Sequence, residues 1–101
     1  MGNFVRVARV SEVPEGTGKV VSANGEEIAL FRTNGTFYAI HNTCLHRGGP
    51  LGEGSLDGAT VTCPWHGWEY DITTGACITN PDAELRCFQV KVEGEDVLVS
   101  A

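Results

Sequence analysis

Two short motifs hold residues that can bind a metal. The first is Cys44-Leu45-His46 and the second is Cys63-Pro64-Trp65-His66, with residues 47–62 between them. Each motif offers one thiolate and one imidazole. Two soft sulfur ligands suit one iron of a [2Fe–2S] cluster, and two imidazoles suit the other iron. The pair therefore predicts a centre that takes one thiolate and one imidazole from each of two segments.

Other kinds of site use the same residue types. Zinc binds two cysteines with two histidines, but structural zinc ligands usually have two to four residues between them, and Cys44-x-His46 is tighter. A four-cysteine cluster needs a Cys-x4-Cys-x2-Cys run, whereas the cysteines here are scattered. A catalytic cysteine–histidine pair would leave the second motif without a role. Zinc stays open as the alternative metal.

The residues that follow the two motifs extend the pattern. Arg47-Gly48-Gly49-Pro50-Leu51 follows the first, and Gly67-Trp68-Glu69-Tyr70-Asp71 follows the second. With these segments the chain resembles a Rieske-type ferredoxin of bacterial ring-hydroxylating dioxygenase systems, over essentially its whole length. The resemblance implies one [2Fe–2S] cluster per chain, with the ligands Cys44, His46, Cys63 and His66.

The resemblance also implies how the site is arranged. The two cysteines would hold the inner iron, and the two histidines would hold the outer iron, with exposed ring edges where electrons enter and leave. Gly48, Gly49 and Gly67 would let backbone N–H groups approach the sulfides, because no side chain intrudes there. Residues 79–82, which contain a proline, would form a loop that covers one side of the cluster.

The chain departs from the high-potential Rieske pattern at several positions. Respiratory Rieske subunits have a disulfide whose cysteines correspond to Gly49 and Trp65, and a serine donor that corresponds to Trp68. Tyr70 is retained where the family's tyrosine donates a hydrogen bond to a cysteine sulfur. One strong donor fewer stabilises the reduced cluster less, so we expect a potential near the low end of the Rieske range of roughly −150 to +300 mV.

This pattern implies a role as an electron carrier. Such a ferredoxin takes single electrons from a flavin-dependent NAD(P)H reductase and passes them to a terminal oxygenase that hydroxylates aromatic rings. The sequence offers no catalytic domain, mononuclear iron site or nucleotide loop, so we expect it not to be an enzyme by itself. A small Rieske-like subunit of an assimilatory nitrite reductase stays open as the alternative.

Length and charge narrow the possibilities further. With 101 residues, the chain is expected to form one domain, residues 1–101. Its net charge of −6 argues against nucleic acid and against an anionic membrane surface as partners. The sequence has no signal peptide pattern and no run of about 20 apolar residues. We therefore expect a cytoplasmic protein, and a monomer.

The framework that must position the motifs reads as all-β, an antiparallel sandwich or barrel. Short strands are expected over residues 4–9, 19–22, 27–32 and 36–41, with a turn over 11–16. Asn24-Gly25 and Asn34-Gly35 favour tight hairpins because both residue types tolerate positive φ. A final hairpin is expected from residues 87–92 and 97–99, and helix content should be minimal.

The segment over residues 42–78 is richer in glycine and is interpreted as a small cluster-binding subdomain inserted in this framework. Short strands are expected at 60–62 and 68–71. Trp65 is interpreted as a partner contact and Trp68 as a core residue, whereas His41 lies outside the motifs. Cys77 and Cys87 are expected to be reduced, small buried residues on strands, with a disulfide between them left open.

Overall fold

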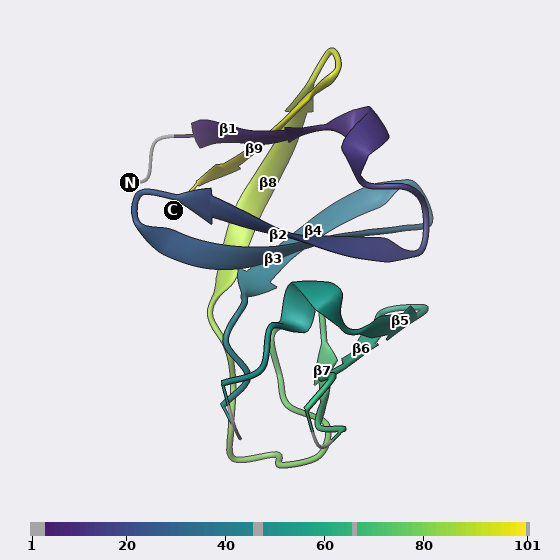
Figure 1. Ribbon diagram of the computed structural model, residues 1–101, viewed down its shortest axis with the longest axis vertical. Helices are drawn as coiled ribbons and strands as arrows, with labels where there is room; N and C mark the ends of the chain where they lie inside the picture. Colours follow the sequence, from purple (N-terminus) through teal and green to yellow (C-terminus); the bar gives the residue numbers. More distant parts are fainter. Residues whose placement is uncertain (1–3, 46–47, 66, 101) are drawn as a thin grey trace.

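The computed structural model describes residues 4–45, 48–65 and 67–100. Within these ranges the chain forms nine strands, two single-turn 3₁₀ helices and no α-helix (Figure 1). The 3₁₀ helices are η1 (Val10–Glu12) and η2 (Leu51–Glu53). The strands are β1 (Phe4–Arg9), β2 (Thr17–Ala23), β3 (Glu26–Thr33), β4 (Thr36–His41), β5 (Ser55–Asp57), β6 (Thr60–Thr62), β7 (Glu69–Asp71), β8 (Cys87–Glu93) and β9 (Asp96–Ser100).

The strands form two antiparallel sheets. The larger has the order β1-β9-β8-β4-β3-β2 and curves into the near-barrel in the upper half of Figure 1. Its two halves are joined where β4 meets β8, through the pairs Ala39↔Phe88 and Ile40↔Cys87. The smaller sheet, β5-β6-β7, lies below it, in the segment that leaves the barrel after β4 and returns at β8. The all-β prediction is confirmed.

Two tight turns connect β2, β3 and β4, as the sequence predicts. Asn24 and Gly25 have φ of 50° and 81°, and Asn34 and Gly35 have φ of 53° and 76°. These positive angles match the twist of the strands that they join. The hairpins set the register, so that Ala23 pairs with Glu26 and Thr33 pairs with Thr36.

Strand β3 is buried on both faces because two cores lie on either side of it. Ile28 and Leu30 face the barrel interior, while Ala29 and Phe31 face the lower half of the molecule. The barrel core consists of Ala8, Val13, Val21, Ala23, Ile28, Leu30, Ala39, Phe88, Val97 and Val99. The lower core consists of Ala29, Phe31, Ile40, Cys44, Leu51, Val61, Cys63, Tyr70, Ile72, Cys77 and Leu85.

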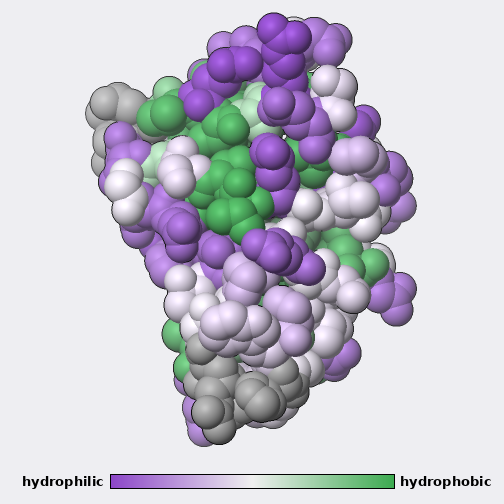
Figure 2. Space-filling view, viewed as in Figure 1, coloured by the Kyte–Doolittle hydropathy of each residue, from purple (hydrophilic) through white to green (hydrophobic). Residues whose placement is uncertain are grey.

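The face of the barrel drawn in Figure 2 has many polar side chains. Figure 2 shows hydrophilic side chains around that half, with one hydrophobic area among them. Among the described residues, no helix has the length or the apolar composition needed to cross a lipid bilayer.

Some local expectations need correction. Cys87 is exposed rather than buried, because β8 turns Phe88 toward the barrel core and its neighbours outward. Cys77 is buried as expected but lies outside the strands, in an isolated bridge with Tyr70, and both cysteines are free thiols. Strand β5 and helix η2 were not predicted, because both lie in a glycine-rich run with little hydrophobic periodicity.

Candidate metal centre

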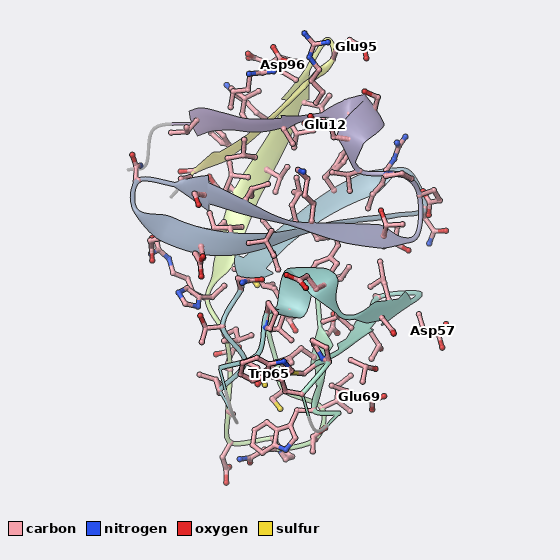
Figure 3. All side chains as sticks on the ribbon, viewed as in Figure 1. Glu12, Asp57, Trp65, Glu69, Glu95 and Asp96 are labelled. Atoms are coloured by element: carbon pink, nitrogen blue, oxygen red, sulfur yellow. The ribbon has the colours of Figure 1, made fainter. Side chains whose placement is uncertain are left out.

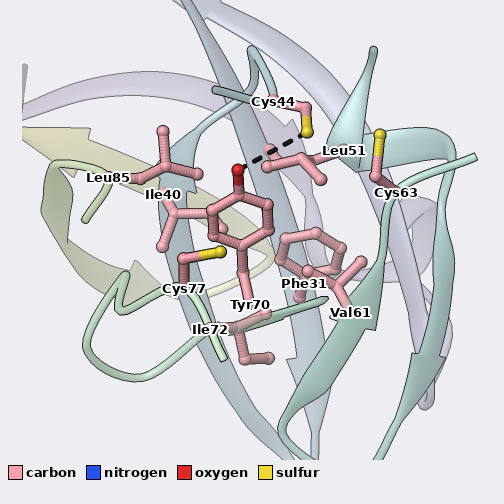
Figure 4. Close-up of a cluster of buried hydrophobic side chains, with 11 residues drawn as sticks. Phe31, Ile40, Cys44, Leu51, Val61, Cys63, Tyr70, Ile72, Cys77 and Leu85 are labelled. Atoms are coloured by element: carbon pink, nitrogen blue, oxygen red, sulfur yellow. Dashed lines mark hydrogen bonds between the residues drawn. The ribbon is translucent and has the colours of Figure 1, made fainter. Parts of the chain in front are cut away.

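The structure brings the cysteines of the two motifs together in the lower core. Cys44 follows β4, Cys63 follows β6, and each is only 2% exposed. Figure 4 shows both sulfur atoms on the same side of this core, with that of Cys44 next to the hydroxyl group of Tyr70. His46, Arg47 and His66 lie outside the described residues.

Backbone hydrogen bonds close the segment that contains Cys44. Its N–H donates to Gly49 O at 3.0 Å, and its carbonyl accepts the Gly48 N–H at 2.8 Å. Thr43 and Pro50 form an isolated bridge on either side of this turn. Gly48 has φ of 74°, which favours glycine. The turn thus holds Cys44 at the end of a narrow hairpin.

The second motif forms a similar turn. The Cys63 N–H donates to Trp68 O at 2.7 Å, and Gly67 has φ of 78°. The Trp65 N–H points back to Sγ of Cys63, at 3.4 Å. A backbone donor therefore lies beside this sulfur, where it would stabilise a metal-bound thiolate.

The two turns touch at Gly49. A Cβ on Gly49 would fall 2.7 Å from Sγ of Cys63 and 3.0 Å from Cγ of Trp65, so no other residue fits there without displacement. Gly49 thus lies directly against a cysteine sulfur, while the approach of its N–H to a cluster sulfide stays a prediction. At Gly48 and Gly67 the positive φ, rather than crowding, is what favours glycine.

Tyr70 lies under Cys44, as Figure 4 shows, and its side chain is fully buried. Its Oη accepts the Leu45 N–H at 3.0 Å and lies 3.4 Å from Sγ of Cys44. A thiolate has no proton to donate, so in the metal-bound form the phenol must be the donor. The donor predicted from the sequence is thus in place.

The electrostatics of the site agree with that assignment. Burial raises the pKa of Tyr70 above its ordinary value, and the contact with Cys44 adds to the effect, so the phenol keeps its proton. Burial also raises the pKa of the Cys63 thiol, while the Trp65 N–H partly offsets this. Buried sulfurs with donors directed at them fit a bound cation, which supplies the positive charge that solvent cannot.

The proline-containing segment is tied to the site through Cys77. Sγ of Cys77 accepts the Asn80 N–H at 3.3 Å, and the Ala83 N–H donates to Asn80 O at 2.9 Å. Cys77 also forms a bridge with Tyr70. The acceptor role of Cys77 was not foreseen, since a cysteine outside both motifs gives no signal in the sequence. That residues 79–82 cover the cluster stays a prediction.

The two tryptophans differ in exposure in the way expected. Trp65 is 51% exposed, and Figure 3 shows it in the lower half of the molecule. Trp68 is partly buried and packs against the lower core. The exposure of Trp65 leaves its indole available to a partner, and its contact role stays a prediction.

An all-β framework that presents two buried, donor-supported thiols at the ends of paired turns is typical of an iron–sulfur protein. Residues 3–99 match the family described as the Rieske [2Fe-2S] domain. The chain belongs to this family, and its cofactor is a [2Fe–2S] cluster.

Several of its relatives are ferredoxin components of dioxygenase systems. It is 33% identical to the ferredoxin component of the naphthalene 1,2-dioxygenase/salicylate 5-hydroxylase systems of Ralstonia sp., covering 96% of this chain and 94% of the relative. It is 36% identical to the biphenyl dioxygenase ferredoxin subunit of Pseudomonas sp. (strain KKS102), covering 95% and 90%. The predicted family resemblance is confirmed.

Solved structures show the same fold. In a complex of reduced oxygenase and oxidized ferredoxin of carbazole 1,9a-dioxygenase, one chain is 33% identical with a TM-score of 0.87, covering 96% of this chain and 92% of that one. A putative nitrite reductase small subunit from Mycobacterium tuberculosis has a TM-score of 0.92 at 18% identity, covering 100% and 96%. At that identity the likeness concerns the fold alone.

Proposed function

We propose that this chain is the ferredoxin of a multicomponent oxygenase. It takes single electrons from a flavin-dependent NAD(P)H reductase and delivers them to a terminal oxygenase that hydroxylates an aromatic ring. Whole-length similarity to dioxygenase ferredoxin components carries the proposal. In this role the chain is an electron-transfer component and performs no catalysis alone.

Within this role, Cys44 and Cys63 would bind one iron, and His46 and His66 the other. The burial of both sulfurs, the contact between their turns, and the donors Trp65 N–H and Tyr70 Oη support the cysteine half of this assignment. The histidine half rests on the motif spacing alone. When bound, the cluster accepts and releases one electron at a time.

Metal analysis of variants tests the ligand set. The purified protein should contain about two irons and two sulfides per chain, and Cys44→Ser or His66→Ala should lose the cluster. Cys87→Ser and His41→Ala are matched controls, because each removes the same residue type outside the motifs, and Cys87 is exposed. Both controls should retain full iron content. One zinc per chain in a colourless wild-type protein would refute the proposal.

The partner would dock where the ligand turns reach the surface. The proposed docking surface consists of Leu45, His46, Arg47, Pro64, Trp65, His66 and Pro81. Leu45 and Trp65 are large apolar side chains that are about half exposed, which supports a contact role. Electron transfer across such a contact needs no deep binding cleft in the carrier.

A direct transfer experiment tests the role. Reduced protein mixed with a ring-hydroxylating oxygenase should reoxidise at a rate that depends on oxygenase concentration, and a dioxygenase reductase with NADH should reduce it again. Coupling to a sirohaem nitrite reductase, with none to the oxygenase, would favour the alternative role.

We also propose that residues 1–101 form one domain with a cluster-binding subdomain near residues 42–78. We further propose a cytoplasmic location, which cell fractionation can test, and a monomeric state, which sedimentation can test.

A further inference from the structure

Asn42 is a polar residue buried at the junction of the barrel and the lower half. It is 4% exposed. Among the described residues, Thr33 is the only other polar residue that is buried. It follows the last residue of β4 and stands two positions before Cys44. A buried amide of this kind is costly unless its polar atoms are bonded.

Asn42 makes hydrogen bonds to two separate parts of the chain. Its backbone N–H donates to Glu27 O on β3 at 3.1 Å, which ties it to the barrel. Its backbone carbonyl accepts the Leu51 N–H at 2.8 Å, and its side-chain Oδ1 accepts the Gly52 N–H at 2.8 Å. The side chain therefore joins the two ends of the segment over residues 42–52.

Gly52 is fixed from its other side by the barrel. A Cβ there would fall 2.7 Å from Cγ2 of Val20 and 2.9 Å from the Val20 backbone nitrogen, so Gly52 lies directly against β2. Helix η2 is thus held between the Asn42 amide and the backbone of β2. Because Gly52 is buried, water does not replace the Asn42 oxygen as an acceptor without local opening.

We infer that Asn42 is a positioning residue for the metal centre. By holding η2 against the barrel, its side chain closes the segment that carries Cys44 and presses Gly49 against Cys63. The distance between the two ligand turns then depends on this amide oxygen, outside both motifs, as well as on the backbone hydrogen bonds within the first turn. The inference rests on the ligand roles proposed above for Cys44 and Cys63.

Replacement of the amide tests this role. Asn42→Ala leaves the Gly52 N–H without its acceptor, and the holoprotein should lose visible absorbance under an iron chelator about tenfold faster than wild type. That ratio corresponds to about 1.4 kcal/mol. The visible circular dichroism and electron paramagnetic resonance spectra of the remaining cluster should also shift, because the ligand turns move relative to each other. Asn42→Asp keeps the Oδ1 acceptor and should restore much of the retention.

Thr33→Ala is the matched control, since Thr33 is also a buried polar residue but lies at the other end of β3. It should leave the cluster spectra unchanged, whatever its effect on unfolding. If Asn42→Ala also leaves the spectra unchanged and accelerates cluster loss only as much as Thr33→Ala, Asn42 has a general structural role and the inference is wrong.

A measurement on the wild-type holoprotein covers the case in which Asn42→Ala does not fold. In hydrogen exchange followed by mass spectrometry, peptides containing Leu51 and Gly52 should exchange as slowly as those of β3. Exchange as fast as in the hairpin at Gly94 would overturn the inference. A cluster retained in Cys44→Ser would instead refute the proposed ligands, so the two failures are distinguishable.

Discussion

Gly49 and Cys63 are in direct contact across the site: a Cβ on Gly49 would fall 2.7 Å from the cysteine sulfur. The two ligand turns therefore do not depend on a bound group alone for their spacing. Backbone packing places them beside each other, and a side chain at this position would push them apart.

Gly49→Ala should therefore reduce cluster content. The added methyl group would displace Cys63 or the ring of Trp65, so we expect iron per chain to fall well below that of wild type. The control is Gly94→Ala, which introduces strain at φ of 62° in the distal hairpin but meets no atom within 4 Å. Gly94→Ala should cost on the order of 1 kcal/mol of stability and keep its iron. Equal iron content in both variants would contradict this prediction.

Tyr70→Phe should lower the midpoint potential. With Cys44 bound to metal as a thiolate, the phenol would donate to its sulfur, and this bond would stabilise the more negative, reduced state more than the oxidised state. Hydrogen bonds to charged groups contribute roughly 1.5–3 kcal/mol, and only the difference between redox states counts. A tenfold change in the equilibrium constant for reduction corresponds to about 59 mV for one electron. We therefore expect voltammetry to show a fall of several tens of millivolts in the midpoint potential. Tyr38→Phe, on β4, should leave the potential in place.

Trp68→Ser should move the potential in the opposite direction. The serine hydroxyl would stand where high-potential Rieske proteins have a donor to a sulfide, and we expect a rise of several tens of millivolts. Trp68 packs against the lower core, so its loss also lowers stability, by up to about 3–5 kcal/mol for a fully buried tryptophan. Voltammetry is meaningful only on protein that retains its cluster. A midpoint that stays or falls would show that this missing donor does not set the potential.

Trp65→Ala should slow electron transfer to the oxygenase while the cluster spectra stay as in wild type. The exposed indole would be lost from the docking surface without disturbing the core. Val92→Ala is a matched control, since Val92 is another large exposed apolar residue, 47% exposed on β8. Stopped-flow rates should fall for Trp65→Ala alone. Altered spectra with an unaltered rate would instead make Trp65 a structural residue.

Complex formation should weaken as salt concentration rises. Residues 48–85 contain Glu53, Asp57, Glu69, Asp71, Asp82 and Glu84 but no lysine or arginine. The ion pairs among the described residues use acidic residues of the barrel, Asp96, Glu26 and Glu93, and none of the six acidic residues of this segment. Glu69→Gln should thus slow association more than Glu95→Gln, whose site lies in the opposite half in Figure 3. An association rate that does not change with ionic strength would indicate that apolar contact alone holds the complex together.

The sequence is sufficient to predict the parts of this structure that depend on local chemistry. Asn24-Gly25 and Asn34-Gly35 specify their turns because few other residues adopt positive φ, and the motifs identify Cys44 and Cys63 without any knowledge of packing. The role of Asn42 and the position of β5 depend on contacts between distant segments. The exposure of Cys87 was mispredicted because either face of a strand is possible until the inward residue, Phe88, is known.

The double burial of β3 has a consequence for engineering. Successive residues of this strand belong to different halves of the molecule: Leu30 faces the barrel core, and Phe31 faces the core that contains the cysteines. The strand separates the two cores and contributes different side chains to each of them. Substitutions at Ile28 and Leu30 would address the scaffold, and those at Ala29 and Phe31 would address the core around the redox centre, so a designer can stabilise one while leaving the other adjustable.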